Sequence, residues 1–230
     1  MIRFRGVSFA YRRGAPVVEV ADLAIGDGLT LVLGPNGSGK STLLRLASGV
    51  ERPDAGTVEV DGRDLWTDEA AARRGLAYVP EQPDVTPYAT VADVLELVCR
   101  LRGEPRARAS AALEEVGLAG LGGRSVRELS MGQRRRAVWA AARIGAPSTI
   151  VLDEPLETLD RAMRDAIVAW TNGALDRGAR VLVATHELEP FLARAARAVS
   201  FEDGRARLWE PVGAALAEAL ARGGAVRPSA

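Results

Sequence analysis

Short apolar runs of strand length alternate along the chain with stretches whose apolar residues recur at helical spacing. Residues 17–34 have the pattern of short strands that end at a glycine. In 41–50 the leucines have the spacing of one helix face, and the pattern stops at Gly49. Residues 56–62 alternate between apolar and polar, which indicates an exposed strand that closes on an Asp-Gly turn.

The middle of the chain has helical patterns only. Amphipathic helices are predicted over 91–103, 107–120 and 131–146. Beyond them, 149–155 and 180–187 are apolar runs bounded by polar residues, which is typical of strands buried on both faces of a sheet. Because strands and helices alternate on both flanks, we expect one α/β domain over 1–230. Its parts are a parallel-sheet core (1–86 and 146–210), a helical insertion (87–145) and a helical tail (211–230).

Composition excludes several classes of protein. The chain has 30 acidic and 30 basic residues, so net charge gives no reason to expect nucleic acid as a partner. Cys99 is the only cysteine, which rules out an internal disulfide and fits a reducing compartment. Neither an apolar leader nor a run of about 18 uncharged apolar residues is present, so we expect a cytoplasmic protein without a membrane span.

The stretch LGPNGSGKST contains Lys40, the only lysine among 30 Lys and Arg residues. Gly34 to Ser41 satisfy the phosphate-loop pattern G-x-x-x-x-G-K-[ST] between a predicted strand and a predicted helix. The glycines let backbone N–H groups point at phosphate oxygens, and the helix N-terminus adds its positive dipole end. A slim ammonium reaches the phosphates where a planar guanidinium is wider and differently directed. A glycine-rich turn that happens to contain lysine is the alternative.

Two further candidate groups lie at strand ends. Asp153 and Glu154 close the apolar run TIVLDEP, where the first can hold Mg²⁺ and the second can polarise an attacking water. His186, the only histidine, closes the run VLVAT and can reach the γ-phosphate and that water. Taken alone, the carboxylates fit a solvated turn equally well, and a lone histidine is more often structural.

These residues resemble the nucleotide-binding subunits of ATP-binding-cassette (ABC) systems. The segment at Lys40 resembles the family's Walker A motif, TIVLDEP resembles Walker B, and ELSMGQRRR resembles the LSGGQ signature. Gln82 matches the Q-loop glutamine, LETLD lies where the D-loop belongs, and ATHE matches the H-loop. Tyr11 matches the aromatic residue that stacks on adenine, with Phe9 as the alternative. The motifs follow the family's order over about Ile2 to Arg207. The Q-loop neighbourhood and the basic run GQRRR look most like bacterial exporter subunits.

The resemblance implies a P-loop NTPase core, a mostly parallel sheet with an antiparallel β subdomain, and a helical signature subdomain. It implies that two such domains face head to tail around two ATP molecules. The catalytic residues would be Glu154, His186 and Gln82, with Mg²⁺ held by Ser41, Gln82 and Asp153. The nucleotide-binding residues would be Tyr11, Gly34, Pro35, Asn36, Gly37, Ser38, Gly39, Lys40, Ser41, Thr42, Ser130, Gly132, Gln133 and Asp160.

The chain departs from the family pattern at two places. Met131 stands where the signature has glycine, and Thr158 replaces a small residue of the D-loop. The first could alter affinity near the γ-phosphate, and the second could alter coupling between subunits. Two interpretations concern other residues. We read the arginine run 134–136 as a solvated helix face, and the four tryptophans, Trp66, Trp139, Trp170 and Trp209, as packing residues.

The expected function is ATP hydrolysis that drives a separate membrane-spanning subunit, with a second ABC subunit as partner and a position on the inner face of the membrane. Export is the favoured direction. The alternatives are an importer or lipoprotein-release ATPase, and a soluble ABC ATPase of the iron–sulfur-assembly type or an ATP-gated scaffold.

Overall fold

The computed structural model describes residues 1–12, 14–82, 88–202 and 204–213. In this part of the chain, ten strands form one sheet in the order β5-β4-β1-β2-β10-β9-β3-β8-β7-β6. The strands are β1 (Ile2–Phe9), β2 (Val18–Ile25), β3 (Gly28–Leu33), β4 (Ala55–Val60), β5 (Arg63–Asp64), β6 (Leu76–Val79), β7 (Thr149–Asp153), β8 (Arg180–Ala184), β9 (Ala195–Glu202) and β10 (Arg205–Trp209).

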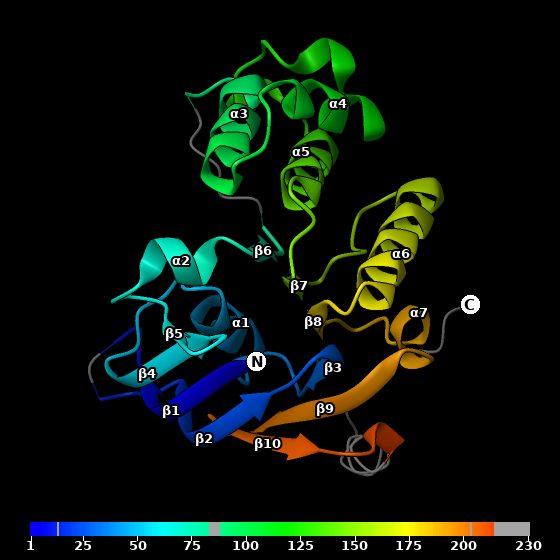
Figure 1. Ribbon diagram of the computed structural model, residues 1–230. Coiled ribbons are helices and arrows are strands. Elements are labelled where there is room, and N and C mark those ends of the chain that lie inside the picture. Colours follow the sequence, from blue (N-terminus) through cyan, green and yellow to red (C-terminus); the bar gives the residue numbers. More distant parts are fainter. Residues whose placement is uncertain (13, 83–87, 203, 214–230) are drawn as a thin grey trace.

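Helices cover the sheet and build a second lobe above it (Figure 1). Figure 1 shows α3, α4 and α5 clustered in this lobe, with α1 and α2 beside the sheet and α6 alongside β8. The helices are α1 (Lys40–Ala47), α2 (Glu69–Arg73), α3 (Val91–Arg102), α4 (Ala107–Glu115), α5 (Met131–Arg143), α6 (Arg161–Asp176) and α7 (Glu189–Leu192).

The sheet has a parallel and an antiparallel half. Strands β9, β3, β8, β7 and β6 run parallel to one another, whereas β1 pairs antiparallel with β2 and β4, and β4 with β5. The hairpin β9–β10 joins the two halves, since β10 is antiparallel to β9 and touches β2. The predicted α/β class, with a mostly parallel core and an antiparallel subdomain, is therefore confirmed.

The parallel strands are buried on both faces, as their unbroken apolar runs predict. Along β7, Ile150 and Leu152 face one core while Val151 faces the other, and β8 alternates in the same way. One core holds α6 and the helical lobe, and the second holds α1 and the antiparallel strands. Helix α1 is therefore enclosed between the two halves of the sheet, and the loop before it is held from both sides.

Helix α5 connects the helical lobe to the rest of the molecule. Its Trp139 is fully buried and lies edge to face with Trp170 of α6, with the ring centroids 5.4 Å apart. At the far end of the helix, Arg102 of α3 donates hydrogen bonds to the carbonyls of Ala141 and Ala142, both at 3.2 Å. The lobe is thus attached to the core mainly by packing along α5, and both tryptophans serve as packing residues.

Some predicted elements differ from those observed. The helix expected over 107–120 ends at Glu115, because Gly117 takes a positive φ of 70° and a short 3₁₀ turn follows at Ala119–Leu121. The local patterns did not single out β1 or the hairpin β9–β10. The predicted lobe boundary at 87 and most of the predicted tail lie outside the described residues, so the proposed subdivision of the chain remains a prediction.

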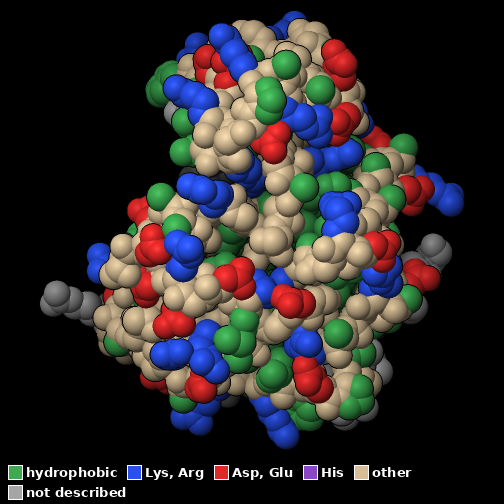
Figure 2. Space-filling view, in the orientation of Figure 1, with side chains coloured by type: hydrophobic (Ala, Val, Ile, Leu, Met, Phe, Trp, Pro, Cys, Tyr) green, Lys and Arg blue, Asp and Glu red, His purple; other side chains and the backbone are tan. Residues whose placement is uncertain are grey.

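Among the described residues, no helix combines the length and the apolar character needed to cross a bilayer. On the face shown in Figure 2, basic and acidic side chains are interspersed over both lobes, as the balanced composition predicts.

We predict that Trp139→Ala lowers the free energy of unfolding by about 3 to 5 kcal/mol, because it opens a cavity at a fully buried site. Trp209→Ala is the matched control: that ring is only partly buried and stacks on Arg207 at 3.9 Å, so we expect a loss of about 1 kcal/mol. Denaturant unfolding of both variants measures the difference. Equal losses would contradict the assignment of Trp139 to the core.

Candidate functional site

The carboxyl ends of three neighbouring parallel strands bring the candidate residues together. Strand β8 lies between β3 and β7, and its Ala184 is the register partner of both Val32 and Asp153. The loop after β3, His186 after β8 and Glu154 after β7 therefore lie along one edge of the sheet. In α/β sheets this edge is where ligands bind.

The loop from Gly34 to Gly39 leaves no room for side chains at its two ends. A Cβ at Gly34 would lie 2.4 Å from the carbonyl oxygen of Phe201, and one at Gly39 would lie 2.5 Å from the ring of Phe201. Both residues have positive φ, 155° and 110°. Gly39 is also the N-cap of α1, where it leaves the first N–H groups of the helix without a capping side chain. The loop thus presents backbone donors to an anion.

Lys40 is buried within this loop. Its Nζ donates to the carbonyl oxygens of Gly34 at 2.8 Å and Pro35 at 3.0 Å. Burial lowers the pKa of Lys40, and the carboxylates of Glu154 and Asp153 offset part of that effect. An ammonium has three hydrogens, and these two bonds leave one of them free to bind a ligand. A buried positive charge with a free donor suits a polyanionic ligand such as a phosphate chain.

Asp153 lies at the end of β7 and accepts a hydrogen bond from Ser41 Oγ at 3.2 Å. Burial raises the pKa of Asp153 to about 6, and the nearby carboxylates of Glu81 and Glu154 add to the shift. A hydroxyl and a carboxylate beside a phosphate loop are the donor set that Mg²⁺ prefers, because it takes oxygen ligands and is commonly shared with phosphates. The residues present therefore fit this ion.

Glu154 and His186 form a pair. The carboxylate of Glu154 accepts from the backbone N–H of His186 at 3.2 Å, and its Oε1 lies 3.4 Å from His186 Nε2. Burial raises the pKa of Glu154, although His186 counteracts the shift. Glu154 also has a positive φ of 45°, a strained conformation that its N–H bond to the Ala184 carbonyl (2.8 Å) helps to hold. A carboxylate with raised proton affinity, oriented by a histidine, is suited to general base chemistry.

Of the two aromatic candidates, Tyr11 is accessible and Phe9 is not. Tyr11 is 52% exposed and Phe9 is 7% exposed, and their rings meet edge to face at 4.9 Å. The Tyr11 hydroxyl lies 3.4 Å from Thr42 Oγ1 and accepts from Arg45 at 3.2 Å. Tyr11 is thus anchored to the helix that follows the phosphate loop, with its ring open to solvent.

The signature residues begin α5 and are already engaged with each other. Ser130 Oγ accepts from the backbone N–H of Gln133 at 3.3 Å, and Gln133 Oε1 accepts from the backbone N–H of Ser130 at 2.9 Å. This is a capping box. Met131 is 55% exposed, and a Cβ added at Gly132 would meet no atom within 4 Å. The helix end therefore presents an open surface.

Two other candidates, Gln82 and Asp160, form no hydrogen bond with the groups above in the described part of the chain. Gln82 is exposed, and no hydrogen bond of the described residues joins it to Ser41 or Asp153. Asp160 is the N-cap of α6, where it accepts from Met163 N at 2.9 Å and pairs with Arg136. The backbone hydrogen bond from Met163 is the main cause of the lowered pKa of Asp160.

The interpretation of the arginine run as a solvated face was wrong. Arg135 is 8% exposed, Arg136 pairs with Asp160, and Arg134 donates to the carbonyls of Leu129 at 3.1 Å and Arg127 at 2.9 Å. The sequence does carry a signal for Arg135. It precedes Trp139 by four residues, so the two share one face of α5.

The chain is similar to known proteins in sequence and in fold. The family model described as "ABC transporter" matches residues 21–157. A sulfate/thiosulfate import ATP-binding protein of Mycolicibacterium paratuberculosis is 36% identical over 85% of this chain and 56% of its own length. An Fe(3+) ions import ATP-binding protein of Streptomyces coelicolor is 37% identical over 84% of this chain and 57% of its own length. A nickel import ATP-binding protein of Rhodobacter capsulatus is 36% identical over 95% of this chain and 90% of its own length. The chain thus spans just over half the length of the first two relatives.

Solved structures agree with these matches. An ATP-binding subunit of an ABC transporter superposes with a TM-score of 0.81 over 98% of this chain and 94% of that chain, and at 22% identity this shows the fold alone. A dimeric ATP-binding cassette in a post-hydrolysis state with ADP and Pi has a TM-score of 0.78 and 26% identity, over 91% of this chain and 98% of that chain.

We predict that Asp153→Asn stabilises the nucleotide-free protein at pH 7 by on the order of 2 to 3 kcal/mol, since it removes a buried charge. The folded-state pKa lies above that of the unfolded chain. The free energy of unfolding of the native sequence should therefore fall as the pH rises from about 4 through about 6, and the Asp153→Asn variant should lose this dependence.

Chemical denaturation without Mg²⁺ at a series of pH values from about 4 to about 7 measures both effects. Asp165→Asn serves as the control, because that side chain is 75% exposed and should change stability by less than about 0.5 kcal/mol. An Asp153→Asn variant less stable than the native protein at pH 7 would show that burial does not destabilise the charged carboxylate.

We also predict that Lys40→Arg weakens ATP binding by about 10-fold or more, although the charge is kept. The planar guanidinium cannot replace a tetrahedral ammonium that fits inside the loop between two carbonyls. Titration with a fluorescent ATP analogue measures the affinity, and Lys40→Ala gives the scale for complete loss. Affinity close to that of the native protein would overturn the geometric argument for this lysine.

Proposed function

The chain belongs to the ABC transporter family, and on that premise we propose that it is the ATP-binding and ATP-hydrolysing subunit of a transporter. The observation that carries the proposal is the carboxyl edge of β3, β8 and β7. There a buried lysine in a phosphate loop, the Ser41–Asp153 pair and the Glu154–His186 pair lie together.

Each group at this edge has a role that its chemistry supports. The backbone N–H groups from Gly34 to Gly39 and the ammonium of Lys40 bind the β- and γ-phosphates. Ser41 and Asp153 would hold Mg²⁺, with Gln82 as a further ligand, and the ion would supply positive charge beside the phosphates. The open ring of Tyr11 supports the adenine.

The hydrolytic step is assigned to Glu154 and His186. Glu154 orients the attacking water and accepts its proton, which its raised pKa favours. His186 holds the carboxylate through its backbone N–H and its Nε2, and it can donate to a γ-phosphate oxygen. The rigid turn at Glu154 keeps this orientation without reorganisation during the reaction.

A second cassette completes the site. Ser130 begins α5 in the helical lobe, whereas Lys40 begins α1 beside the sheet (Figure 1). The open end of α5 can therefore contact a phosphate bound by another chain, where Ser130, Gly132 and Gln133 offer a hydroxyl and helix N–H groups. Exposed Met131 would lie in that interface, and Asp160 would contact the other subunit across it. The dimeric state of a similar cassette supports this arrangement.

Import is the direction that we propose. The expectation of an exporter rested on likeness around the Q-loop and in the basic run GQRRR, whereas the three relatives described above are all named import ATP-binding proteins. Their named cargoes include an anion and metal cations, so the cassette itself does not determine the charge of the cargo. A separate membrane-spanning subunit would select it and would hold this chain at the inner face of the membrane.

We predict that Glu154→Gln binds ATP, fails to turn it over and accumulates as a closed dimer. Glutamine keeps the acceptor for the His186 N–H but cannot take a proton from water. Light scattering with and without ATP measures the dimer, and purification of the tagged variant from its native cells identifies what binds to it. We expect a polytopic membrane protein of the importer type in stoichiometric amount.

Glu187→Gln is the matched control, since Glu187 follows His186 but pairs with Arg164 of α6 instead. The Glu187→Gln variant should hydrolyse ATP, so that the closed dimer does not accumulate and the protein is mostly monomeric. A Glu154→Gln protein that stays monomeric with saturating ATP would argue against a homodimer. Capture of soluble partners only would favour the assembly or scaffold alternatives over transport.

A further inference from the structure

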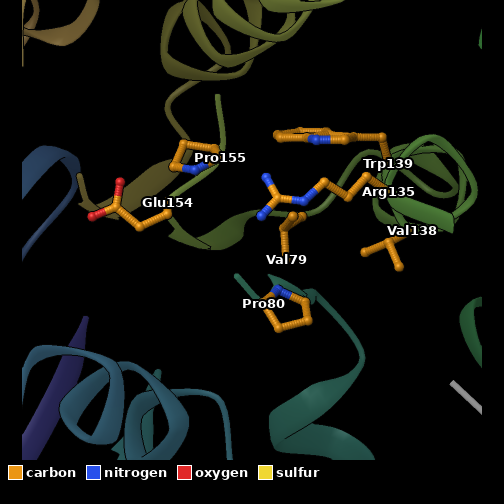
Figure 3. A pocket seen from close by; sticks show the side chains of 7 residues that line it. All are labelled: Val79, Pro80, Arg135, Val138, Trp139, Glu154 and Pro155. Atoms are coloured by element: carbon orange, nitrogen blue, oxygen red, sulfur yellow. The ribbon is translucent and has the colours of Figure 1, made fainter. Parts of the chain in front are cut away.

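Arg135 is a buried cation close to the catalytic edge, and the roles assigned above do not use it. It lies in the second turn of α5, the helix that begins with the signature, and its side chain is 9% exposed. Figure 3 shows its guanidinium extending from α5 into the space between Val79 and Pro155, with the ring of Trp139 alongside. The carboxylate of Glu154 points away from it in this view.

The guanidinium joins two loops that are far apart in sequence. Its Nη2 donates to the carbonyl oxygen of Glu81 at 2.7 Å, and its Nη1 donates to the carbonyl oxygen of Glu157. The carboxylate of Glu157 lies 3.5 Å from Nη2. A planar fork with donors in fixed directions can hold both carbonyls at once, which few other side chains can do. Arg135 therefore binds three segments together: the signature helix, the Q-loop and the D-loop.

The surroundings make these bonds costly to break. Val79, Pro80, Trp139 and Pro155 line a cavity of about 10 Å³ beside the guanidinium, close to the size of one water molecule. Nε of Arg135 is buried and has no hydrogen-bond partner among the described residues. A cation in such apolar surroundings is tolerated only while its remaining hydrogens are bound.

Each loop carries a group of the proposed hydrolytic site. Glu81 directly precedes Gln82, and Glu157 closes the turn that starts at Glu154, where its N–H lies 3.4 Å from the Glu154 carbonyl oxygen. The next residue, Thr158, has a positive φ of 57°, which is unusual for a β-branched residue and persists only where the surroundings impose it. The bond from Arg135 to the Glu157 carbonyl is such a restraint.

We propose that Arg135 is a positioning residue that ties the Gln82 segment and the Glu154–Thr158 turn to the signature helix. When the phosphates of ATP bound to a second subunit contact the start of α5, the Gln82 segment and the Glu154–Thr158 turn then move or become fixed together. The inference rests on the proposed ATPase function, and it assigns Arg135 no contact with ATP.

The test compares Arg135→Gln and Arg135→Lys with the native protein. In Arg135→Gln we expect kcat for ATP hydrolysis to fall by about 10- to 100-fold, because small displacements of catalytic groups have effects of this size. The affinity of the monomer for ATP should change by less than about threefold, since Lys40 and the phosphate loop are untouched. Lysine keeps the charge but reaches one carbonyl at a time, so Arg135→Lys should lie between the two.

Arg102→Gln is the matched control. Arg102 is also a buried arginine that binds backbone carbonyls, those of Ala141, Ala142, Ile144 and Leu76, but it contacts neither loop of the site. Both glutamine variants should lower the free energy of unfolding. Only the change at Arg135 should lower kcat and speed hydrogen–deuterium exchange at 81–82 and 156–159 together.

Three outcomes would overturn the proposal: a kcat of Arg135→Gln within about threefold of native, an equal loss in Arg102→Gln, or faster exchange in one loop only. Should Arg135→Gln not fold, the same readouts apply to Arg135→Lys. A native protein without ATPase activity would refute the proposed function instead, and the exchange experiment would still decide whether Arg135 couples the loops.

Discussion

The parallel pairing of β3, β8 and β7 is the constraint on which the rest of this structure depends. Ala184 of β8 is in register with Val32 on one side and Asp153 on the other, so three strands end at one level. The phosphate loop lies far from the other two strand ends in the sequence, yet the loop, the acidic pair and the histidine meet there. A shift of one residue in either pairing would separate Ser41 from Asp153, since their bond is already 3.2 Å long.

The same arrangement concentrates charge where it is least stable. Lys40 has a lowered pKa and Asp153 and Glu154 have raised ones, and burial is the first cause in all three. The pKa values of the two acids rise and that of the neighbouring lysine falls, so in each case the neutral form is favoured. The attraction between these opposite charges therefore does not compensate for the hydration that they lose on burial. A phosphate chain and a divalent cation would supply the missing charges. The buried charges therefore lower the stability of the ligand-free protein and raise its affinity for a phosphate ligand, which is typical of functional sites.

Local sequence signals predicted the parts of this site that depend on local structure. The loop and the strand ends each follow from a short motif with its own backbone requirement, whereas the helix caps made by Ser130 and Asp160 were found only in the structure. Strand order was out of reach of patterns alone, as was β1, because its partners β2 and β4 are chosen by long-range packing. Arg135 was misread for the same reason: an arginine looks solvated until the loops that bury it are in place.

Helix α5 shows why such long-range contacts matter for the mechanism. Its first turns are bonded to the core through Arg135, through the Arg136–Asp160 pair and through Trp139 against Trp170, and its last turn is bonded to the helical lobe through Arg102. A displacement of Ser130 would thus be passed to the Glu157 turn through the hydrogen bond from Arg135. The helix can move relative to the sheet only by carrying that turn along or by leaving a guanidinium unpaired in an apolar pocket. Leaving the guanidinium unpaired costs more free energy than moving the turn with the helix. The signature helix and the catalytic turn should therefore move as one rigid unit.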